Sequence, residues 1–450
     1  TELAHENSEN SLNTQVSRFN SRSSTELTTR HVVHIRSMSD MIPKKARKYK
    51  DHRTEIPLRP NAKISLWSLI SNMIGKDLSK VPLPVNFNEP LSMLQRVAES
   101  LEYSNLLDAA SACDCPRLQM CYVIAFSISN YFSTSFRANK PFNPLLGETF
   151  ECDRMEELGW RCVCEQVSHH PPVCALHAEG EGWILFETFD VKSKFKAKYL
   201  EIQPKGLSQL LFTRTGYRYS WNKVTTYVNN IVLGTLWIDQ GGEFTVNNHS
   251  TGDIALVKFY PYTMFRSCDH KKVIGTVKDK DDQPRYSING YWDKFIECSK
   301  LASKSASEDV IINKKMLWTP TPLPKGSEKM YHFSTFTCSL NDPDPMVAPT
   351  DSRWRPDQRV MEDGDFDLAN KIKVQLEDSQ RIRRKKILDD AINSGEATSE
   401  TTIEEIQKPL WFKIDPTITH AACPIYAYKG GYWEAKLKGD FSMCPKLFDI

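Results

Sequence analysis

Two adjacent histidines followed by two prolines are the residues of this sequence best suited to chemistry. They lie in residues 165–172, which read EQVSHHPP. Pro171 restricts His170 to an extended or polyproline conformation, and Pro172 cannot donate a ladder hydrogen bond, so a strand is expected to end here. Neighbouring side chains of a strand point to opposite faces, which predicts that His169 and His170 face opposite ways. Imidazole N–H groups donate hydrogen bonds to anions, most strongly when the ring is protonated.

Three kinds of site compete for this histidine pair. A zinc site built on His169 and His170 needs ligands at separated spacings, such as H-x3-H on a helix, and none is present. A hydrolase that uses Ser168 and His169 needs a G-x-S-x-G elbow around the serine, which is absent. An anion cradle fits better because basic residues recur in nearby motifs. From composition alone, a structural histidine pair remains the simplest interpretation.

A second group of charged residues lies on a long helix predicted over residues 365–393. Its apolar stripe consists of Leu368, Ile372 and Leu376. Lys373, Glu377 and Arg381 form a separate stripe at spacings of four residues. From spacing alone, this stripe indicates an exposed ladder of ion pairs, each contributing a few tenths of a kcal/mol.

A long sheet is predicted between these two groups. From about residue 142 to 340 the hydrophobic period is two, and glycine-containing turns recur at short intervals. This pattern predicts one large antiparallel sheet that is closed or nearly closed and can enclose a cavity. The clearest alternation is in residues 191–199, where four lysines face one side. This lysine face either contacts an anionic membrane or is a solvated face that prevents edge association, and the second interpretation is simpler.

Apolar helices are predicted before the sheet. Residues 64–74 show a helical period and end at Gly75, a suitable C-cap. The apolar stripe of this segment consists of Ile64, Trp67, Ile70 and Ile74. A helix of about three turns is marginal alone, so its apolar face must dock on a core or a ligand. Residues 91–132 are predicted to form two further helices, the first around Leu94 and the second around Tyr122.

The composition excludes several classes of protein. The 450 residues carry 58 Lys and Arg against 56 Asp and Glu, a net charge of +2, which argues against a nucleic-acid binder held by phosphate contacts. No apolar run reaches about 18 residues, so no membrane-spanning helix is expected. The 12 scattered cysteines are typical of buried thiols in the cytosol. The first residue is Thr1, which is typical of a fragment.

Residues 1–54 are rich in Ser, Thr, Asn and charge, which predicts a disordered or linker segment. A basic run at residues 44–50 either anchors the chain to anionic lipid or is an ordinary solvated linker charge run. The second interpretation is the simpler one.

The segment EQVSHHPP resembles the signature of the oxysterol-binding protein family. Residues 140–148, KPFNPLLGE, resemble a second segment of that family, and residues 87–91 and 349–359 add further similarity. The similarity runs from about Leu66 to Ile450, and residues 236–240 make it greatest to the branch that contains oxysterol-binding protein itself. One departure is Trp354, which stands where a smaller aliphatic residue is expected and should affect packing more than ligand choice.

The resemblance implies an α+β fold, a large incompletely closed antiparallel β-barrel around a hydrophobic tunnel. It divides the lipid-binding domain, residues 55–450, into a lid (55–90), helices (91–135), the barrel (136–345) and a C-terminal helical part (346–450). The lid or tunnel residues implied are Ile64, Trp67, Ile70, Ile74 and Leu78.

The resemblance also implies a lipid-transfer protein and not an enzyme, with no cofactor and no metal. Its partners would be a sterol or oxysterol, phosphatidylinositol 4-phosphate and the surfaces of anionic membranes, but not nucleic acid. Such a protein is cytosolic and peripherally attached to membranes, at endoplasmic reticulum–Golgi or other contact sites. The residues that match the family's headgroup-binding positions are Lys140, Asn143, His169, His170, Lys373, Glu377 and Arg381. Phosphatidylserine in place of sterol, a membrane-tethering scaffold and a Ser/His hydrolase are the alternatives.

Overall fold

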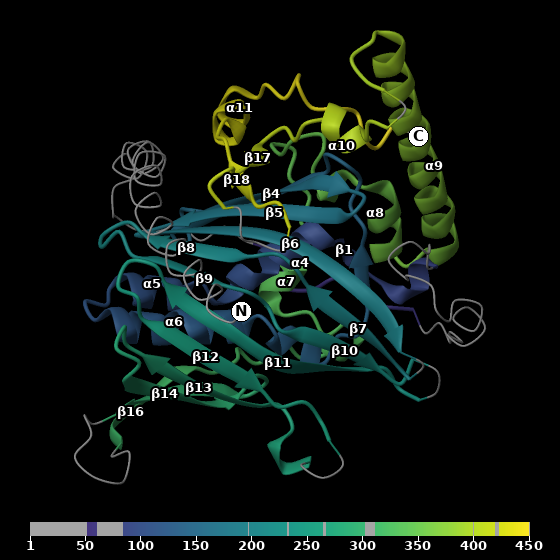
Figure 1. Ribbon diagram of the computed structural model, residues 1–450. Coiled ribbons are helices and arrows are strands. Elements are labelled where there is room, and N and C mark those ends of the chain that lie inside the picture. The colour runs from purple at the N-terminus through teal and green to yellow at the C-terminus, as the bar shows by residue number, and fades with distance from the viewer. Residues whose placement is uncertain are drawn as a thin grey trace, which may run out of the picture.

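A computed structural model gives the structure of the chain (Figure 1). The structure describes residues 52–60, 84–196, 198–231, 234–263, 267–301, 311–398, 400–418 and 423–449. The predicted lid helix at 64–74, Leu78 and the basic run at 44–50 lie outside these residues. None of the helices in the described ranges is long and apolar enough to cross a membrane.

One antiparallel sheet of 14 strands dominates the described part of the chain. Its main path runs β16-β15-β14-β13-β12-β11-β10-β7-β6-β5-β4-β3, and β8 and β9 form a second connection between β6 and β11. Because β3 and β16 stand at opposite ends of this path, the barrel is not closed, as expected. The strands are β3 (Thr149–Arg154), β4 (Trp160–His169), β5 (Pro172–Gly180), β6 (Trp183–Lys196), β7 (Tyr199–Pro204), β8 (Ser208–Phe212), β9 (Arg218–Trp221), β10 (Thr225–Asn229), β11 (Trp237–Asn248), β12 (Ile254–Phe259), β13 (Lys272–Lys278), β14 (Pro284–Tyr291), β15 (Phe295–Leu301) and β16 (Ile311–Trp318).

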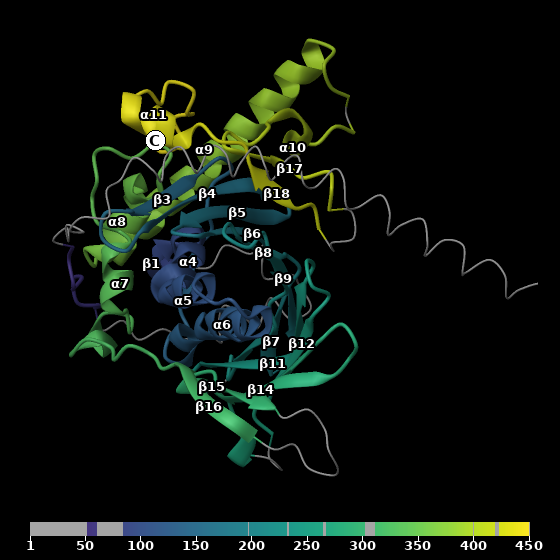
Figure 2. The ribbon, with the colours of Figure 1, turned by 90° about the vertical axis from the view of Figure 1, so that its left-hand side faces the viewer.

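The sheet curves around three helices, which fill its interior (Figure 2). These are α4 (Met93–Ala98), α5 (Asn105–Ser111) and α6 (Pro116–Ser129). Every residue of α6 from Gln119 to Ser129 is buried, and a helix that is apolar on all sides belongs in a core. The curved sheet and these helices therefore share one hydrophobic core.

The second of the two helices predicted within residues 91–132 is confirmed as α6, but the first is wrong in detail. Leu91 lies in a short strand, β1 (Asn88–Ser92), which pairs in parallel with β2 (Lys140–Phe142). Ser92 and Gln95 then form a reciprocal capping box that starts α4. After α4 the chain tightens into a 3₁₀ turn, η4 (Glu99–Tyr103), before α5 begins.

The predicted lysine-bearing strand is a hairpin. β6 ends at Lys196, and Tyr199 begins β7 directly opposite Lys196. Lys192, Lys194 and Lys196 are exposed and alternate with half-buried residues, so the alternation itself is confirmed. The sheet also ends earlier than expected, at Trp318, because residues 319–345 form turns, η7 (Ser327–Lys329) and α7 (Thr335–Ser339).

The C-terminal part packs against one side of the barrel. The long helix predicted over 365–393 is confirmed as α9 (Phe366–Asn393), and its N-cap Asp365 accepts a hydrogen bond from the Leu368 N–H at 2.9 Å. The shorter elements around it are η8 (Ser352–Trp354), α8 (Pro356–Glu362), α10 (Ile403–Ile406), β17 (Phe412–Ile414), β18 (Tyr426–Tyr428) and α11 (Tyr432–Lys438). Trp354 is 44% exposed, so a little more than half of it is covered, and its effect on packing stays a prediction.

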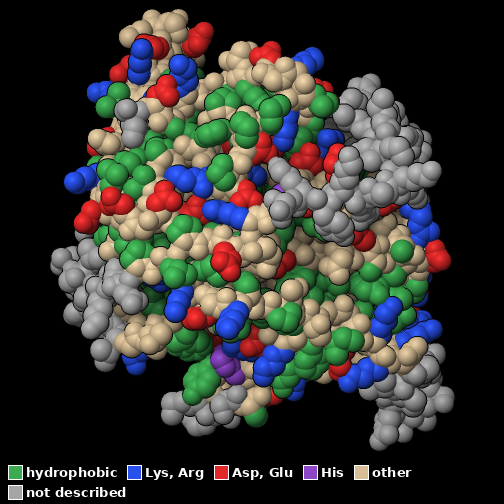
Figure 3. Space-filling view, turned by 180° about the vertical axis from the view of Figure 1, so that it is seen from behind, with side chains coloured by type: hydrophobic (Ala, Val, Ile, Leu, Met, Phe, Trp, Pro, Cys, Tyr) green, Lys and Arg blue, Asp and Glu red, His purple; other side chains and the backbone are tan. Residues whose placement is uncertain are grey.

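Residues 52–60 form an extended segment that is tied to the domain by ion pairs. Arg53 contacts Asp342 at 2.9 Å and Glu362 at 2.5 Å, and His52 contacts Glu157 at 2.8 Å. Over the face seen in Figure 3, acidic and basic side chains are interspersed, in keeping with the near balance of charge in the sequence.

Candidate functional site

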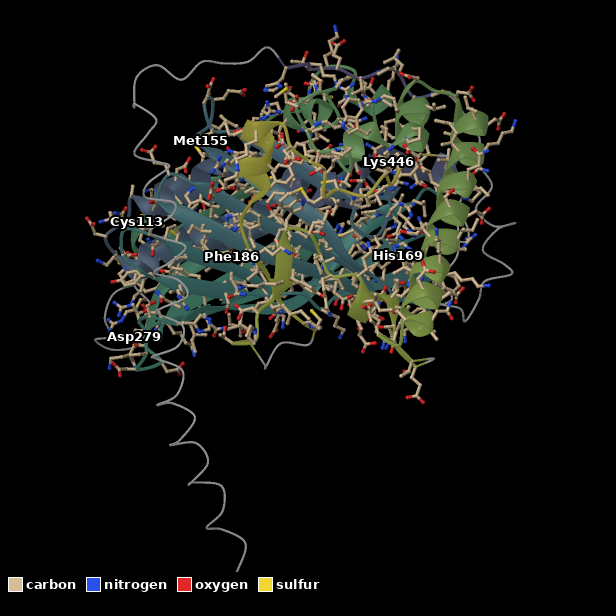
Figure 4. The ribbon with its side chains drawn as sticks, turned by 90° about the horizontal axis from the view of Figure 1, so that it is seen from above. Cys113, Met155, His169, Phe186, Asp279 and Lys446 are labelled. Carbon is tan, nitrogen blue, oxygen red and sulfur yellow. The ribbon has the colours of Figure 1, made fainter. Side chains whose placement is uncertain are left out.

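Three segments that are far apart in the sequence meet beside α9. They are residues 140–148, the hairpin between β4 and β5, and one face of α9 itself. Figure 4 shows His169 at the end of its strand next to the α9 helix. Basic and imidazole side chains from separate segments thus lie along one helix, as an anion site requires.

The histidine pair sits in a tight hairpin and not at a point where the chain leaves the sheet. His169 ends β4, Pro172 begins β5, and the two residues are paired in the ladder. The Ser168 hydroxyl donates to the Pro171 carbonyl at 2.7 Å and closes the turn. The predicted opposite orientation of the two rings is wrong, since their centroids are 4.8 Å apart. His170 belongs to the turn, so strand alternation does not govern it.

His169 is a neutral imidazole at pH 7. Burial, together with the neighbouring charges of His170 and Arg384, lowers its pKa to about 4, although the Pro144 carbonyl opposes the shift. Its Nε2 lies 2.9 Å from Nε2 of Gln380 on α9. The protonated donor considered from the sequence is therefore not the resting state of this ring.

A pair of lysines forms the second half of the site. Lys373 is only 8% exposed, and its ammonium lies 2.7 Å from Oε1 of Glu377. Burial and the charge of Lys373 lower the pKa of Lys140, whereas Glu377 opposes that shift. Two ammonium groups thus lie within electrostatic range of one carboxylate, which leaves a positive excess suited to an anion. The exposed-ladder interpretation is wrong for Lys373 because this residue is buried.

The rest of the predicted stripe faces another way. Arg381 has a 66% exposed side chain, is paired with Asp378, and comes no closer to Glu377 than 4.0 Å. At 3.6 residues per turn, a residue eight positions after Lys373 is rotated by about 80° around the helix. The structure therefore does not bring Arg381 against the histidine pair.

Two residues that do face the pair were missed from the sequence. Gln380 and Arg384 follow Lys373 by seven and eleven positions, which places both within about 20° of it around the helix. Arg384 lies 3.2 Å from Glu404 of α10, and Glu404 also accepts the His170 backbone N–H at 3.2 Å. Successive steps of four, three and four residues from Lys373 lead to Glu377, Gln380 and Arg384. Extending the stripe by these steps would have identified both residues.

Asn143 lies at the exposed margin of this region. Its backbone carbonyl accepts a hydrogen bond from the buried Arg355 at 2.9 Å. Arg355 in turn contacts Glu148 at 2.9 Å and Asp357 at 2.8 Å. This buried network fixes the path of residues 140–148 and so the position of Lys140 relative to α9.

A separate cavity of about 150 Å³ lies between the enclosed helices and the inner face of the sheet. Much of its wall is apolar, including Met93, Val97, Phe189 and Val224. Its lining also includes Glu102, whose pKa is raised to about 7 by burial and by the charge of Glu99. The cavity thus combines an apolar wall with a small polar region.

The competing chemistries find little support in this geometry. Ser168 lies in a strand and its hydroxyl is engaged in closing the hairpin. Among the residues that the structure describes, no three His, Cys, Asp or Glu side chains are grouped as metal ligands would be. The cysteines of the described part are free thiols, and seven of them are buried.

Comparison with known proteins shows clear sequence similarity over most of the chain. The family model described as oxysterol-binding protein matches residues 65–437. Mouse oxysterol-binding protein 2 is 46% identical over 420 residues, which cover 91% of this chain and 46% of that protein. Mouse oxysterol-binding protein-related protein 3 is 39% identical and covers 81% of this chain and 43% of its own length. The chain spans about half the length of the curated relatives that it matches.

Solved structures of similar fold have been determined with bound lipid. The Osh1 ORD domain in complex with cholesterol has a TM-score of 0.76 and 31% identity, with 89% of this chain and 94% of that chain covered. The Osh3 ORD in complex with PI(4)P from Saccharomyces cerevisiae has a TM-score of 0.73 and 30% identity, with 89% and 100% covered.

Proposed function

The chain belongs to the oxysterol-binding protein family, and from that premise we propose that it binds a sterol or oxysterol and phosphatidylinositol 4-phosphate in one tunnel and exchanges them between membranes. The observation that carries the proposal is the convergence of Lys140, Lys373 and the histidine hairpin beside α9. Lys373 comes more than 200 residues after the other two segments in the sequence, and the site has more positive than negative charge.

The headgroup of the phosphoinositide is the ligand proposed for this convergence. Its phosphates carry several negative charges, which need charge-assisted donors when they leave water. Lys140 and Lys373 supply two ammonium groups, and binding an anion relieves their mutual repulsion. The seven residues that match the family's headgroup positions are Lys140, Asn143, His169, His170, Lys373, Glu377 and Arg381. Of these, Arg381 would have to exchange Asp378 for phosphate, a small rearrangement for an exposed side chain.

The sterol is proposed to occupy the interior next to the enclosed helices. The cavity of about 150 Å³ is smaller than the roughly 300–1,000 Å³ typical of small-molecule sites, so the tunnel must widen when cargo enters. Residues 55–90 are proposed as the lid, residues 91–135 as the helices, residues 136–345 as the barrel and residues 346–450 as the C-terminal part. The solved relatives with cholesterol and with PI(4)P support this pair of cargoes.

Membrane contact sites are the proposed place of action, because counter-exchange needs two membranes within reach. Phosphatidylserine is the second candidate for the cargo that is exchanged for the phosphoinositide, since it needs the same apolar interior. No chemical turnover of the lipid is proposed.

A transfer assay between liposomes tests the proposal. Sterol, phosphatidylserine and phosphatidylinositol 4-phosphate are offered side by side, and we expect sterol and the phosphoinositide to move in opposite directions. The double variant His169→Ala with His170→Ala should retain sterol binding and lose phosphoinositide extraction, with thermal melting to confirm folding. Equal loss of both lipids in a folded double variant would show that the headgroup assignment is wrong.

A further inference from the structure

Gln380 connects the three segments of the candidate site, and its contacts fix the orientation of its amide. It is 6% exposed on α9. Its Oε1 lies 2.7 Å from the backbone N of Leu146, and its Nε2 lies 2.9 Å from Nε2 of His169. A backbone N–H can only donate, so the atom that faces Leu146 must be the oxygen. The NH2 group therefore faces the imidazole.

This orientation determines which nitrogen of His169 carries the proton. An amide NH2 can only donate, so Nε2 of His169 must accept, and the proton of the neutral ring resides on Nδ1. Nδ1 is buried and makes no hydrogen bond of ordinary geometry within the described residues, although the Pro144 carbonyl lies near enough to favour protonation. The groups whose charge disfavours protonation of the ring are His170, Arg384 and Arg355.

A buried N–H without a full partner costs free energy unless a ligand satisfies it. Lys140 and Lys373 give the site an excess of positive charge over Glu377, so the ligand that suits this N–H is an anionic acceptor oxygen. A phosphate offers such oxygens, whether it belongs to a lipid headgroup or is free in solution. The other tautomer would present a lone pair at Nδ1, which repels phosphate oxygen.

We propose that Gln380 is a positioning residue that donates to Nε2 of His169 and thereby keeps an N–H at Nδ1 for a phosphate oxygen. Gln380 itself does not touch the ligand. The inference rests on the proposed function, because it assigns a phosphate ligand to the same site. It assigns a supporting role at this site to an uncharged residue, which the charge pattern of the helix does not reveal.

Matched substitutions on α9 test this role. Gln380→Glu keeps the shape of the side chain and one oxygen that accepts from the Leu146 N–H. Its second oxygen replaces the NH2 donor and can only accept from the ring. The proton of the ring then moves to Nε2, or the ring becomes charged. Gln380→Met removes the donor without adding charge. Gln375→Glu, on an exposed position of the same helix, adds the same charge away from His169 and serves as the control.

The first measurement is ¹⁵N NMR of the histidine side chains in the ligand-free protein, which reports the tautomer directly. We expect Nδ1–H for His169 in the wild type and in Gln375→Glu, and a protonated Nε2 in Gln380→Glu. An Nε2–H tautomer in the wild type, or an unchanged tautomer in Gln380→Glu, would overturn the inference.

The second measurement is equilibrium binding of short-chain phosphatidylinositol 4-phosphate, with inorganic phosphate and a sterol in parallel. We expect Gln380→Glu to weaken phosphoinositide binding about tenfold or more and Gln380→Met about threefold, with sterol affinity unchanged. Equal losses in Gln375→Glu would overturn the inference by showing a general charge effect. A wild type that binds inorganic phosphate but not the phosphoinositide, with the tautomer as expected, would refute the proposed function and leave the role of Gln380 supported.

Discussion

Replacing Lys373 by methionine separates ligand binding from folding at this site. The ammonium of Lys373 is buried, contacts Glu377 at 2.7 Å, and lowers the pKa of Lys140. Methionine keeps most of the apolar stem but removes the charge. Loss of the ion pair lowers the free energy of unfolding, whereas relief of the repulsion with Lys140 raises it. Lys140 also remains as a cation near Glu377. Because the Glu377 side chain is 28% exposed and is not left buried without a partner, we expect the free energy of unfolding to change by no more than about 1 kcal/mol.

The effect on ligand affinity should be larger. A charged hydrogen bond to a ligand contributes roughly 1.5–3 kcal/mol, so Lys373→Met should weaken binding of short-chain phosphatidylinositol 4-phosphate about ten- to a hundredfold. Equilibrium binding gives the affinity, and urea unfolding gives the stability. Lys371→Met, at an exposed position of the same helix, is the matched control and should change neither quantity appreciably. A Lys373→Met protein that loses more than about 2 kcal/mol of stability, while its affinity stays within threefold, would refute this reasoning.

Three further predictions concern His169, Arg381 and the proposed lid. His169 has a pKa of about 4 when folded against 6.5 as the ordinary value, so the unfolded chain binds the extra proton between these values and the protein loses stability as the pH falls through this window. Between pH 7 and pH 5, the free energy of unfolding measured with urea should therefore decrease by about 2 kcal/mol less in His169→Gln than in the wild type. An equal decrease in both proteins would contradict the burial of this ring. Arg381→Ala should weaken phosphoinositide binding less than Lys373→Met does in the same assay, with stability within about 0.5 kcal/mol because its ion pairs are exposed; a greater affinity loss would mean that Arg381 is the principal phosphate ligand. Deleting residues 64–78 should speed sterol dissociation, measured by stopped-flow transfer to acceptor vesicles, and an unchanged rate would argue against a lid.

The sequence predicted the elements whose periodic pattern is long and uninterrupted. α9 was expected at nearly its observed bounds and α6 at its observed place, because their apolar residues recur at helical spacing. The segment before α6 was predicted less well, since β1 depends on pairing with β2 about 50 residues later, and no local pattern encodes that partner. The hairpin of the histidine pair was missed for a related reason. It depends on the Ser168 hydroxyl closing the turn onto Pro171, which period-two alternation does not represent.

The headgroup residues were expected only through the family resemblance. Spacing alone suggested an exposed ladder on the C-terminal helix, because a charge pattern shows which residues can pair but not what covers them. Burial of Lys373 results from tertiary packing against α9, which no local pattern encodes. Gln380 was overlooked because it carries no charge, although its distance of seven residues from Lys373 places it on the same side of the helix.

The open edges of the 14-stranded sheet bear on how the protein accommodates cargo. In a closed barrel the circumference is fixed by the strand number and the stagger of the ladder, so widening it would break backbone hydrogen bonds. Here β3 and β16 end the sheet without meeting. These two edge strands can therefore move apart without breaking the backbone hydrogen bonds between neighbouring strands. Expansion then costs mainly side-chain packing between the wall and the helices it surrounds. The same sheet could thereby enclose proposed cargoes of different width, such as a rigid ring system and a pair of flexible acyl chains, without a change of strand register.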